Sequence, residues 1–102
     1  MKKIMFLCSA GMSTSMLVQK VEAAAKEKGF ESKIWASSEA EAKKYYDDVD
    51  VIMLGPQVRF LLNKVKKEVE GKDVKVDIID TVNYGRMNGE AVLEQIMGIL
   101  NN

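Results

Sequence analysis

The residue with the most reactive side chain is Cys8, the single cysteine of this 102-residue chain. A run of mostly small residues follows it: Ser9, Ala10, Gly11, Met12, Ser13, Thr14 and Ser15. Small side chains and a glycine let main-chain N–H groups turn inward around an anion. Where such a run enters a helix, the helix dipole favours a bound phosphate and also a thiolate. The pattern therefore predicts that Cys8 carries a phosphoryl group and that residues 9–15 hold it.

Two absences narrow this chemistry. The chain has no histidine, so Ser-His and Cys-His catalysis and phosphohistidine within this chain are excluded. No Lys or Arg stands between Cys8 and Gln19, so no side chain there neutralises the charge that builds up when water attacks phosphate. The loop is predicted to hold phosphate while giving its hydrolysis little help.

Simpler interpretations of Cys8 stay open at this point. A lone cysteine at the end of a buried strand is often an inert small apolar residue, and a Ser/Gly run can be an ordinary turn that caps a helix. A binding module that only senses phosphate would never be modified on Cys8. Thiol redox exchange is disfavoured because there is no second cysteine in a Cys-x-x-Cys pair.

Charge and hydropathy exclude several classes of partner. Lys plus Arg and Asp plus Glu number 15 each, which gives no basic excess for nucleic acid or an anionic membrane. Apolar runs are far shorter than the roughly 20 residues that span a bilayer, so no membrane insertion is expected. Neither GxGxxG nor GxxxxGK[ST] occurs, so no nucleotide, organic cofactor or metal is implied. We expect a single cytoplasmic domain over residues 1–102, and a monomer.

Hydrophobic periodicity predicts the elements that position this loop. Apolar runs predict strands at residues 3–8, 33–36, 51–54 and 74–79. Helical spacing predicts helices at about residues 13–28, 39–46, 58–69 and 92–100. This alternation is typical of an α/β fold, an open doubly wound sheet of four parallel strands in the order 2-1-3-4 with helices on both faces.

Ligands of such sheets bind at the carboxyl ends of the strands, where the strand order reverses. Here that point lies between the first and third strands, where Cys8 ends its strand. Gln57 and Tyr84, in the segments after the third and fourth strands, belong to the same edge, either as site residues or as ordinary loop residues. Asp80 is a candidate general acid, although a carboxylate at this position is more often a helix cap. Met12 and Met16 beside the loop could form an apolar docking patch.

Three segments carry a family resemblance: residues 3–18 around Cys8, residues 50–57 and residues 79–85. Together they resemble the enzyme IIB component of the bacterial phosphoenolpyruvate-dependent sugar phosphotransferase system, of the lactose/cellobiose/chitobiose class, over essentially the whole chain. The resemblance implies that Cys8 accepts a phosphoryl group from phosphohistidine of a IIA protein. It also implies that Cys8 passes the group to a sugar, of cellobiose or chitobiose type, that is bound to the membrane component IIC.

The main alternative is a phosphocysteine hydrolase similar to low-molecular-weight tyrosine phosphatases. Those enzymes use a Cys-x5-Arg loop, but the sixth residue after Cys8 is Thr14. Without the arginine, the transition state is less stabilised, and the rate of attack on a phosphomonoester is expected to fall on the order of a hundredfold or more.

Overall fold

The computed structural model describes residues 1–8 and 12–101, except that the side chains of Met12 and Ser13 are not described. Its strands are β1 (Lys2–Leu7), β2 (Ser32–Ser37), β3 (Val51–Leu54) and β4 (Lys75–Ile78). Its α-helices are α1 (Met12–Glu27), α2 (Glu39–Ala42), α3 (Leu62–Glu68), α4 (Thr81–Gly85) and α5 (Gly89–Leu100), and two 3-10 helices are η1 (Lys43–Tyr45) and η2 (Pro56–Leu61).

The four strands form one parallel sheet in the order β2-β1-β3-β4, as the sequence predicts. The register aligns Leu7 of β1 with Ser37 of β2 and with Leu54 of β3. The three strands therefore end level with one another. Cys8, which follows Leu7, lies at this carboxyl edge between the ends of two neighbouring strands.

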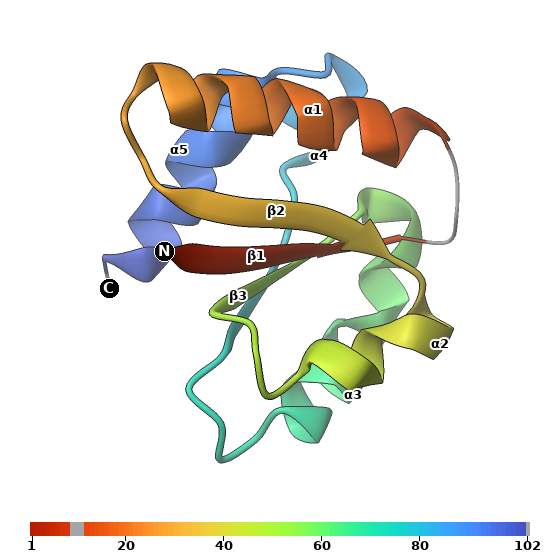
Figure 1. The fold of residues 1–102 in the computed structure, drawn as a ribbon. Helices are drawn as coiled ribbons and strands as arrows, with labels where there is room; N and C mark the ends of the chain where they lie inside the picture. Colours follow the sequence, from red (N-terminus) through yellow and green to blue (C-terminus); the bar gives the residue numbers. More distant parts are fainter. Residues whose placement is uncertain (9–11, 102) are drawn as a thin grey trace.

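Helices cover both faces of the sheet: α1 and α5 lie on one face, and α2 and α3 on the other (Figure 1). Because side chains alternate along a strand, Ile4 and Phe6 of β1 pack under α1 and α5, whereas Met5 and Leu7 pack against the opposite layer. All four side chains are fully buried. The continuous apolar run of β1 is thus the signature of a central strand with a core on each side.

Two helices differ from the sequence prediction. The helix expected at 39–46 is the four-residue α2 followed by η1, and the helix expected from residue 58 begins as η2 before α3. Val58 lies outside helical geometry, at φ −116° and ψ 25°, so the chain kinks there. Apolar side chains spaced three or four residues apart suit both helix types, so their period does not distinguish a kinked 3-10 segment from a straight α-helix.

The segment after β4 also differs, because residues expected as a loop form the short helix α4. The Asp80 carboxylate accepts a hydrogen bond from the main-chain N–H of Asn83 at 3.0 Å, and the N–H of Asp80 donates to Gln95 Oε1 at 3.1 Å. Asp80 is therefore the N-cap of α4, as the capping alternative predicts. Among the described residues, none of the helices is long and apolar enough to cross a bilayer.

Candidate active site

Cys8 directly follows β1 and is a free, buried cysteine with 8% of its surface exposed. Its N–H donates to the carbonyl of Ser37 at 3.1 Å, and the N–H of Gly55 donates to the carbonyl of Leu7 at 2.9 Å. These main-chain bonds extend the ladders on both sides of β1 by one step. Cys8 is thereby held where the chain leaves the sheet, and the residue keeps a small accessible surface there.

The predicted anion loop is described only in its second half. Ser9, Ala10 and Gly11 lie outside the described residues, as do the side chains of Met12 and Ser13. The helix α1 begins at Met12, four residues beyond Cys8, so a helix N-terminus follows the cysteine as the sequence predicts. Ser15 is exposed, whereas Thr14 is only 3% exposed. The cradling role of residues 9–15 stays a prediction.

The buried hydroxyl of Thr14 contacts Tyr84, with 3.1 Å between Thr14 Oγ1 and the Tyr84 hydroxyl. The amide Nε2 of Gln57 donates to the same Tyr84 hydroxyl, also at 3.1 Å. Thr14 belongs to α1, Gln57 to η2 and Tyr84 to α4, the segments that follow β1, β3 and β4. The structure therefore brings together three of the residues that the sequence places at one edge. Gln57 and Tyr84 lie in short helices rather than in loops.

Gly55, directly after β3, also shapes this edge. A Cβ atom at Gly55 would lie 2.9 Å from Gln57 Oε1 and 3.9 Å from the Cβ of Cys8. The Gln57 side chain thus occupies the space that a larger residue 55 would fill. In the sequence, a glycine directly before Pro56 indicates the end of a strand and the start of a helix. That pattern does not reveal the close packing of Gln57 against Gly55.

Exposed apolar side chains lie on the same three elements. Met16 is 50% exposed, Phe60 76% and Val82 58%. Each stands two or three residues from one of the three hydrogen-bonded side chains, on α1, η2 and α4 respectively. Exposed large apolar side chains are candidates for contact with another protein. The prediction for Met16 agrees with its exposure, while the side chain of Met12 lies outside the described residues.

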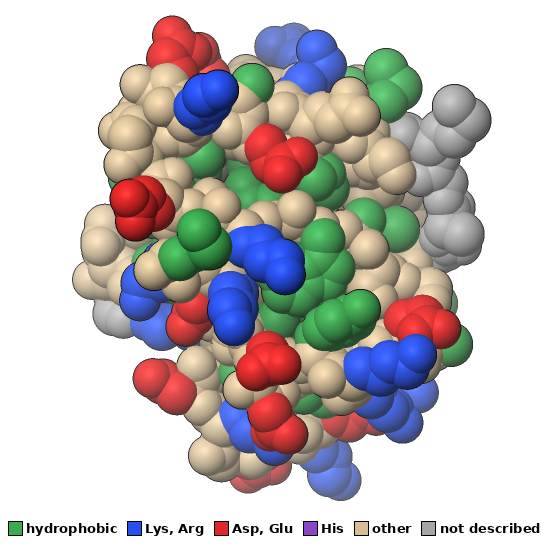
Figure 2. All heavy atoms as spheres, viewed as in Figure 1, with side chains coloured by type: hydrophobic (Ala, Val, Ile, Leu, Met, Phe, Trp, Pro, Cys, Tyr) green, Lys and Arg blue, Asp and Glu red, His purple; other side chains and the backbone are tan. Residues whose placement is uncertain are grey.

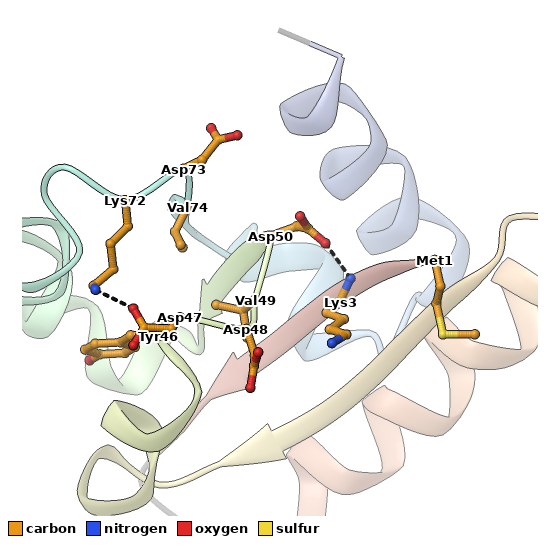
Figure 3. A pocket seen from close by; sticks show the side chains of 10 residues that line it. All are labelled: Met1, Lys3, Tyr46, Asp47, Asp48, Val49, Asp50, Lys72, Asp73 and Val74. Carbon is orange, nitrogen blue, oxygen red and sulfur yellow. Dashed lines mark hydrogen bonds and ion pairs between the residues drawn. The ribbon is translucent and has the colours of Figure 1, made fainter.

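The opposite edge of the sheet has a different character. A hollow of about 400 Å³ is lined there by residues that include Asp47, Asp48, Asp50 and Asp73 (Figure 3). Lys72 pairs with Asp47, and the main-chain N–H of Lys3 donates to Asp50 at 2.8 Å. This edge holds the amino ends of β1, β3 and β4. Its four carboxylates outnumber the side-chain cations of Lys3 and Lys72, so the hollow is less suited to a phosphoryl group than a helix N-terminus is.

Charge over the rest of the surface is mixed. On the face shown in Figure 2, Lys and Arg side chains are interspersed with Asp and Glu side chains. Within the described part of the chain, no group of three or more acidic, histidine or cysteine side chains is placed to hold a metal ion. The carboxyl edge of the sheet is the place where the candidate residues meet.

Comparison with known proteins decides the family. The family model "PTS system, Lactose/Cellobiose specific IIB subunit" matches residues 3–95. The chain belongs to this IIB family. IIB components are phosphotransferases of the sugar phosphotransferase system and work with IIA and IIC partners, so this chain is a phosphotransferase component of the lactose/cellobiose type.

Relatives of known specificity carry different sugar names. The oligo-beta-mannoside-specific EIIB component of Bacillus subtilis (strain 168) is 38% identical over 102 residues, which cover 100% of this chain and 99% of the relative. The galactose-specific component of Lactococcus lactis subsp. cremoris (strain MG1363) is 39% identical, and the cellobiose-specific component of Lactococcus lactis subsp. lactis (strain IL1403) is 38% identical. Each of these two matches covers 98% of this chain and 97% of the relative.

Solved structures agree with this membership. The solution structure of the cellobiose-specific IIB component from Borrelia burgdorferi has a TM-score of 0.80 at 40% identity, covering 99% of this chain and 93% of that one. The lactose-specific IIB domain from Streptococcus pneumoniae has a TM-score of 0.87 at 16% identity, covering 96% of each chain. The second likeness shows the fold alone.

Proposed function

We propose that Cys8 is the phosphoryl carrier of this IIB protein. It accepts a phosphoryl group from the phosphohistidine of a IIA protein and donates the group to a sugar bound by the membrane component IIC. The observation that carries the proposal is the position of Cys8 at the reversal point of the sheet, between the ends of β2 and β3 and four residues before α1. A thiolate and a phosphate are both favoured in front of a helix N-terminus.

The two transfers balance as in-line displacements. In the first, a bond forms between the Cys8 thiolate sulfur and phosphorus while the bond from phosphorus to the histidine nitrogen breaks, and a proton already on the other ring nitrogen of the phosphohistidine lets the histidine leave as a neutral imidazole. In the second, a sugar hydroxyl oxygen bonds to phosphorus, the sulfur–phosphorus bond breaks, and Cys8 leaves as a thiolate. The hydroxyl proton passes to solvent or to a base beside the sugar. Positioning and main-chain hydrogen bonds supply the stabilisation.

The loop residues 9–15 hold the phosphoryl group between the two transfers. Ser9, Ala10, Gly11, Met12 and Ser13 contribute main-chain N–H groups, and the hydroxyls of this run add donors. The absence of a cation between Cys8 and Gln19 leaves water a poor competitor for the phosphocysteine. This suits a carrier, which has to keep its phosphoryl group until the correct acceptor arrives.

Both partners reach Cys8 from the carboxyl edge, where the exposed side chains of Met16, Phe60 and Val82 offer apolar contact. The interfaces are transient, because one carrier has to exchange IIA for IIC in each cycle. The protein acts as a single cytoplasmic domain and as a monomer. The sugar is of cellobiose or chitobiose type, and IIC makes the selective contacts with it.

The comparisons give no support to the phosphatase alternative. The position of the phosphatase arginine is held by Thr14, which is 3% exposed and bonded to Tyr84. An arginine there would have to displace that contact. The protein alone is therefore expected to leave a generic aryl phosphate unhydrolysed.

The test is phosphorylation in a reconstituted relay. The protein is mixed with phosphoenolpyruvate, the upstream carriers and IIA, and the modified residue is located by mass spectrometry. We expect one phosphoryl group on the peptide that contains Cys8, and none on the Cys8→Ser variant. Label on any other residue, or hydrolysis of an aryl phosphate by the protein alone, would contradict the proposal.

A further inference from the structure

The hydroxyl of Tyr84 joins two side chains that are distant in sequence. It lies 3.1 Å from Thr14 Oγ1, 70 residues away, and accepts a hydrogen bond from Gln57 Nε2, 27 residues away, at 3.1 Å. The two side chains come from α1 and η2, the segments that follow β1 and β3 on either side of the reversal point. A single phenol oxygen thus joins the segments that follow β1 and β3.

Burial makes the contact with Thr14 informative. Thr14 is 3% exposed, and a buried hydroxyl costs free energy unless it forms a hydrogen bond. A valine of similar shape would fill the same space without needing a partner. The chain instead keeps a hydroxyl at this position in the first turn of α1, together with a tyrosine that reaches it from α4.

The second partner, Gln57, lies against Gly55, which also borders Cys8. Its amide Nε2 bonds to Tyr84, while its Oε1 lies over Gly55, at 2.9 Å from where a Cβ would stand. The same point lies 3.9 Å from the Cβ of Cys8. Gln57 and Cys8 therefore both border Gly55, and Tyr84 holds the Gln57 side chain there.

We infer that Tyr84 is a positioning residue for phosphoryl transfer at Cys8, because its hydroxyl fixes Thr14 of α1 and Gln57 of η2 relative to each other before the phosphoryl group arrives. The inference rests on the proposed function of Cys8. Hydrogen-bond donors that are held in place before the reaction need no reorganisation during it. A small displacement of these donors therefore slows the transfer step without weakening the binding of IIA. Tyr84 acts through Thr14 and Gln57 and needs no contact with phosphorus.

The chain offers a matched control for the removal of this hydroxyl. Tyr46 also donates to a side chain, Glu68 Oε1 at 3.0 Å, but it lines the hollow at the opposite edge of the sheet. Tyr84→Phe and Tyr46→Phe therefore both remove one phenol hydroxyl, although Tyr84 loses contacts to two neutral side chains and Tyr46 loses one hydrogen bond to a carboxylate. Only Tyr84→Phe alters the contacts with Thr14 and Gln57.

The test measures single-turnover transfer from phosphorylated IIA to the full-length protein over a range of IIA concentrations. We expect Tyr84→Phe to lower the maximal rate about tenfold while the IIA concentration for half-maximal rate changes by less than about twofold. Tyr46→Phe should keep the wild-type rate although it lowers the thermal midpoint. Equal rates for wild type and Tyr84→Phe, or equal slowing by both variants, would overturn the inference.

A double-mutant cycle separates positioning from general loosening. Because Tyr84 acts through both Thr14 and Gln57, the loss of rate in the double variant Thr14→Val/Tyr84→Phe should be smaller than the product of the two single losses, whereas independent roles give multiplied losses. Thr14→Ser, which keeps the hydroxyl, should recover most of the rate. Multiplied losses, or no recovery with serine, would count against the inference.

Gly55→Ala supplies a second approach through Gln57. The added methyl group meets only the end of a flexible side chain within 3 Å, so the fold should survive while Gln57 moves off Tyr84. We expect slower transfer with an unchanged half-saturating IIA concentration, and a wild-type rate would count against the inference.

If wild-type protein gains no label on Cys8 at all, the proposed function fails and this inference with it. If wild type is labelled and Tyr84→Phe transfers equally fast, the inference alone fails.

Discussion

The carbonyl oxygen of Ser37 contacts Cys8 twice, because it accepts the Cys8 N–H at 3.1 Å and lies 3.9 Å from the Cys8 sulfur. The first contact fixes the main chain of Cys8 against the end of β2, and the second holds the sulfur toward the same strand. With 8% of its surface exposed, Cys8 combines a fixed sulfur with a narrow approach. A phosphoryl donor therefore has to present its phosphorus at the carboxyl edge of the sheet.

This geometry predicts that the reactivity of Cys8 depends on the size of the reagent. The rate of thiol modification in native protein, divided by the rate in unfolded protein, should fall as the reagent grows from iodoacetamide to a bulky maleimide. Because the native and unfolded rates are compared for the same reagent, the ratio reports steric access and cancels the intrinsic reactivity of each reagent toward thiols. Rates would be followed by mass spectrometry. The same ratio for both reagents would show that the sulfur is open.

A second prediction concerns the crossing of α1 and α5. A Cβ at Gly89 would lie 2.5 Å from the main-chain carbon and oxygen of Lys20, so the two helices touch through their backbones. Gly89→Ala has to push α5 away from α1, and we expect a loss of about 1–3 kcal/mol in the free energy of unfolding. Urea unfolding followed by circular dichroism measures it.

The matched control for this change is Gly98→Ala on the same helix. Gly98 is exposed, and a Cβ there would meet nothing within 4 Å. Alanine in an open helical position should stabilise the protein by about 0.5–1 kcal/mol. If the two variants shifted the free energy of unfolding in the same direction, the close approach of Lys20 would not be the reason that position 89 requires a glycine.

A third prediction tests the apolar surface around the site. Phe60 is 76% exposed on η2, and in the proposed function it contacts a partner protein. Phe60→Ser should raise the IIA concentration for half-maximal transfer about tenfold, because exposed aromatic side chains often dominate protein interfaces. Stability should change by no more than about 0.5 kcal/mol, as is usual for exposed positions.

Phe60→Leu is the conservative comparison for this surface. Leucine keeps an apolar side chain at the same position and should retain most of the affinity for IIA. Transfer kinetics for the two variants would be measured at equal IIA concentrations. Indistinguishable kinetics for wild type, Phe60→Ser and Phe60→Leu would place the IIA interface elsewhere.

The sheet and its edge were predictable because the relevant signals are local. Continuous apolar runs identify strands with a core on both faces, and the alternation of strands and helices restricts the connections to right-handed crossovers. Once the strands are parallel, every residue after a strand lies at the same edge. Cys8, Gln57 and Tyr84 could therefore be assigned to one edge without any knowledge of contacts between them.

The contacts themselves were not predictable because they depend on short elements. The helix α4 spans five residues and is held by the Asp80 cap, with Gln95 bonded to the Asp80 N–H, and a segment of that length shows no clear hydrophobic period. Its turn brings Tyr84 back toward Thr14. The kink at Val58 similarly sets the direction of η2 through backbone angles that the apolar pattern does not encode. The cradle at Ser9, Ala10 and Gly11 stays a prediction because these residues lie outside the described chain.

The last prediction uses the pH dependence of stability at the edge opposite Cys8. The Tyr46 hydroxyl donates to Glu68 Oε1 at 3.0 Å. Burial, followed by the hydrogen bond and negative charge of Glu68, raises the pKa of Tyr46 from its ordinary value of 10.0 to about 12. The folded protein thus favours the neutral phenol, whereas the unfolded chain releases the proton near pH 10.0.

The sign of the effect follows from this difference. The stabilisation from Tyr46 is complete below pH 10.0 and is lost as the pH rises toward about 12, because only the unfolded chain ionises readily in that range. Tyr46→Phe lacks this titration and, at neutral pH, also lacks a hydrogen bond with a net contribution of about 1 kcal/mol. The stability advantage of wild type over Tyr46→Phe should therefore be constant up to pH 10.0 and shrink above it. Urea midpoints of both proteins measure this, and lysine titrations common to both cancel in the difference. A difference that stayed constant through pH 12 would mean that burial and Glu68 do not hold the proton on Tyr46.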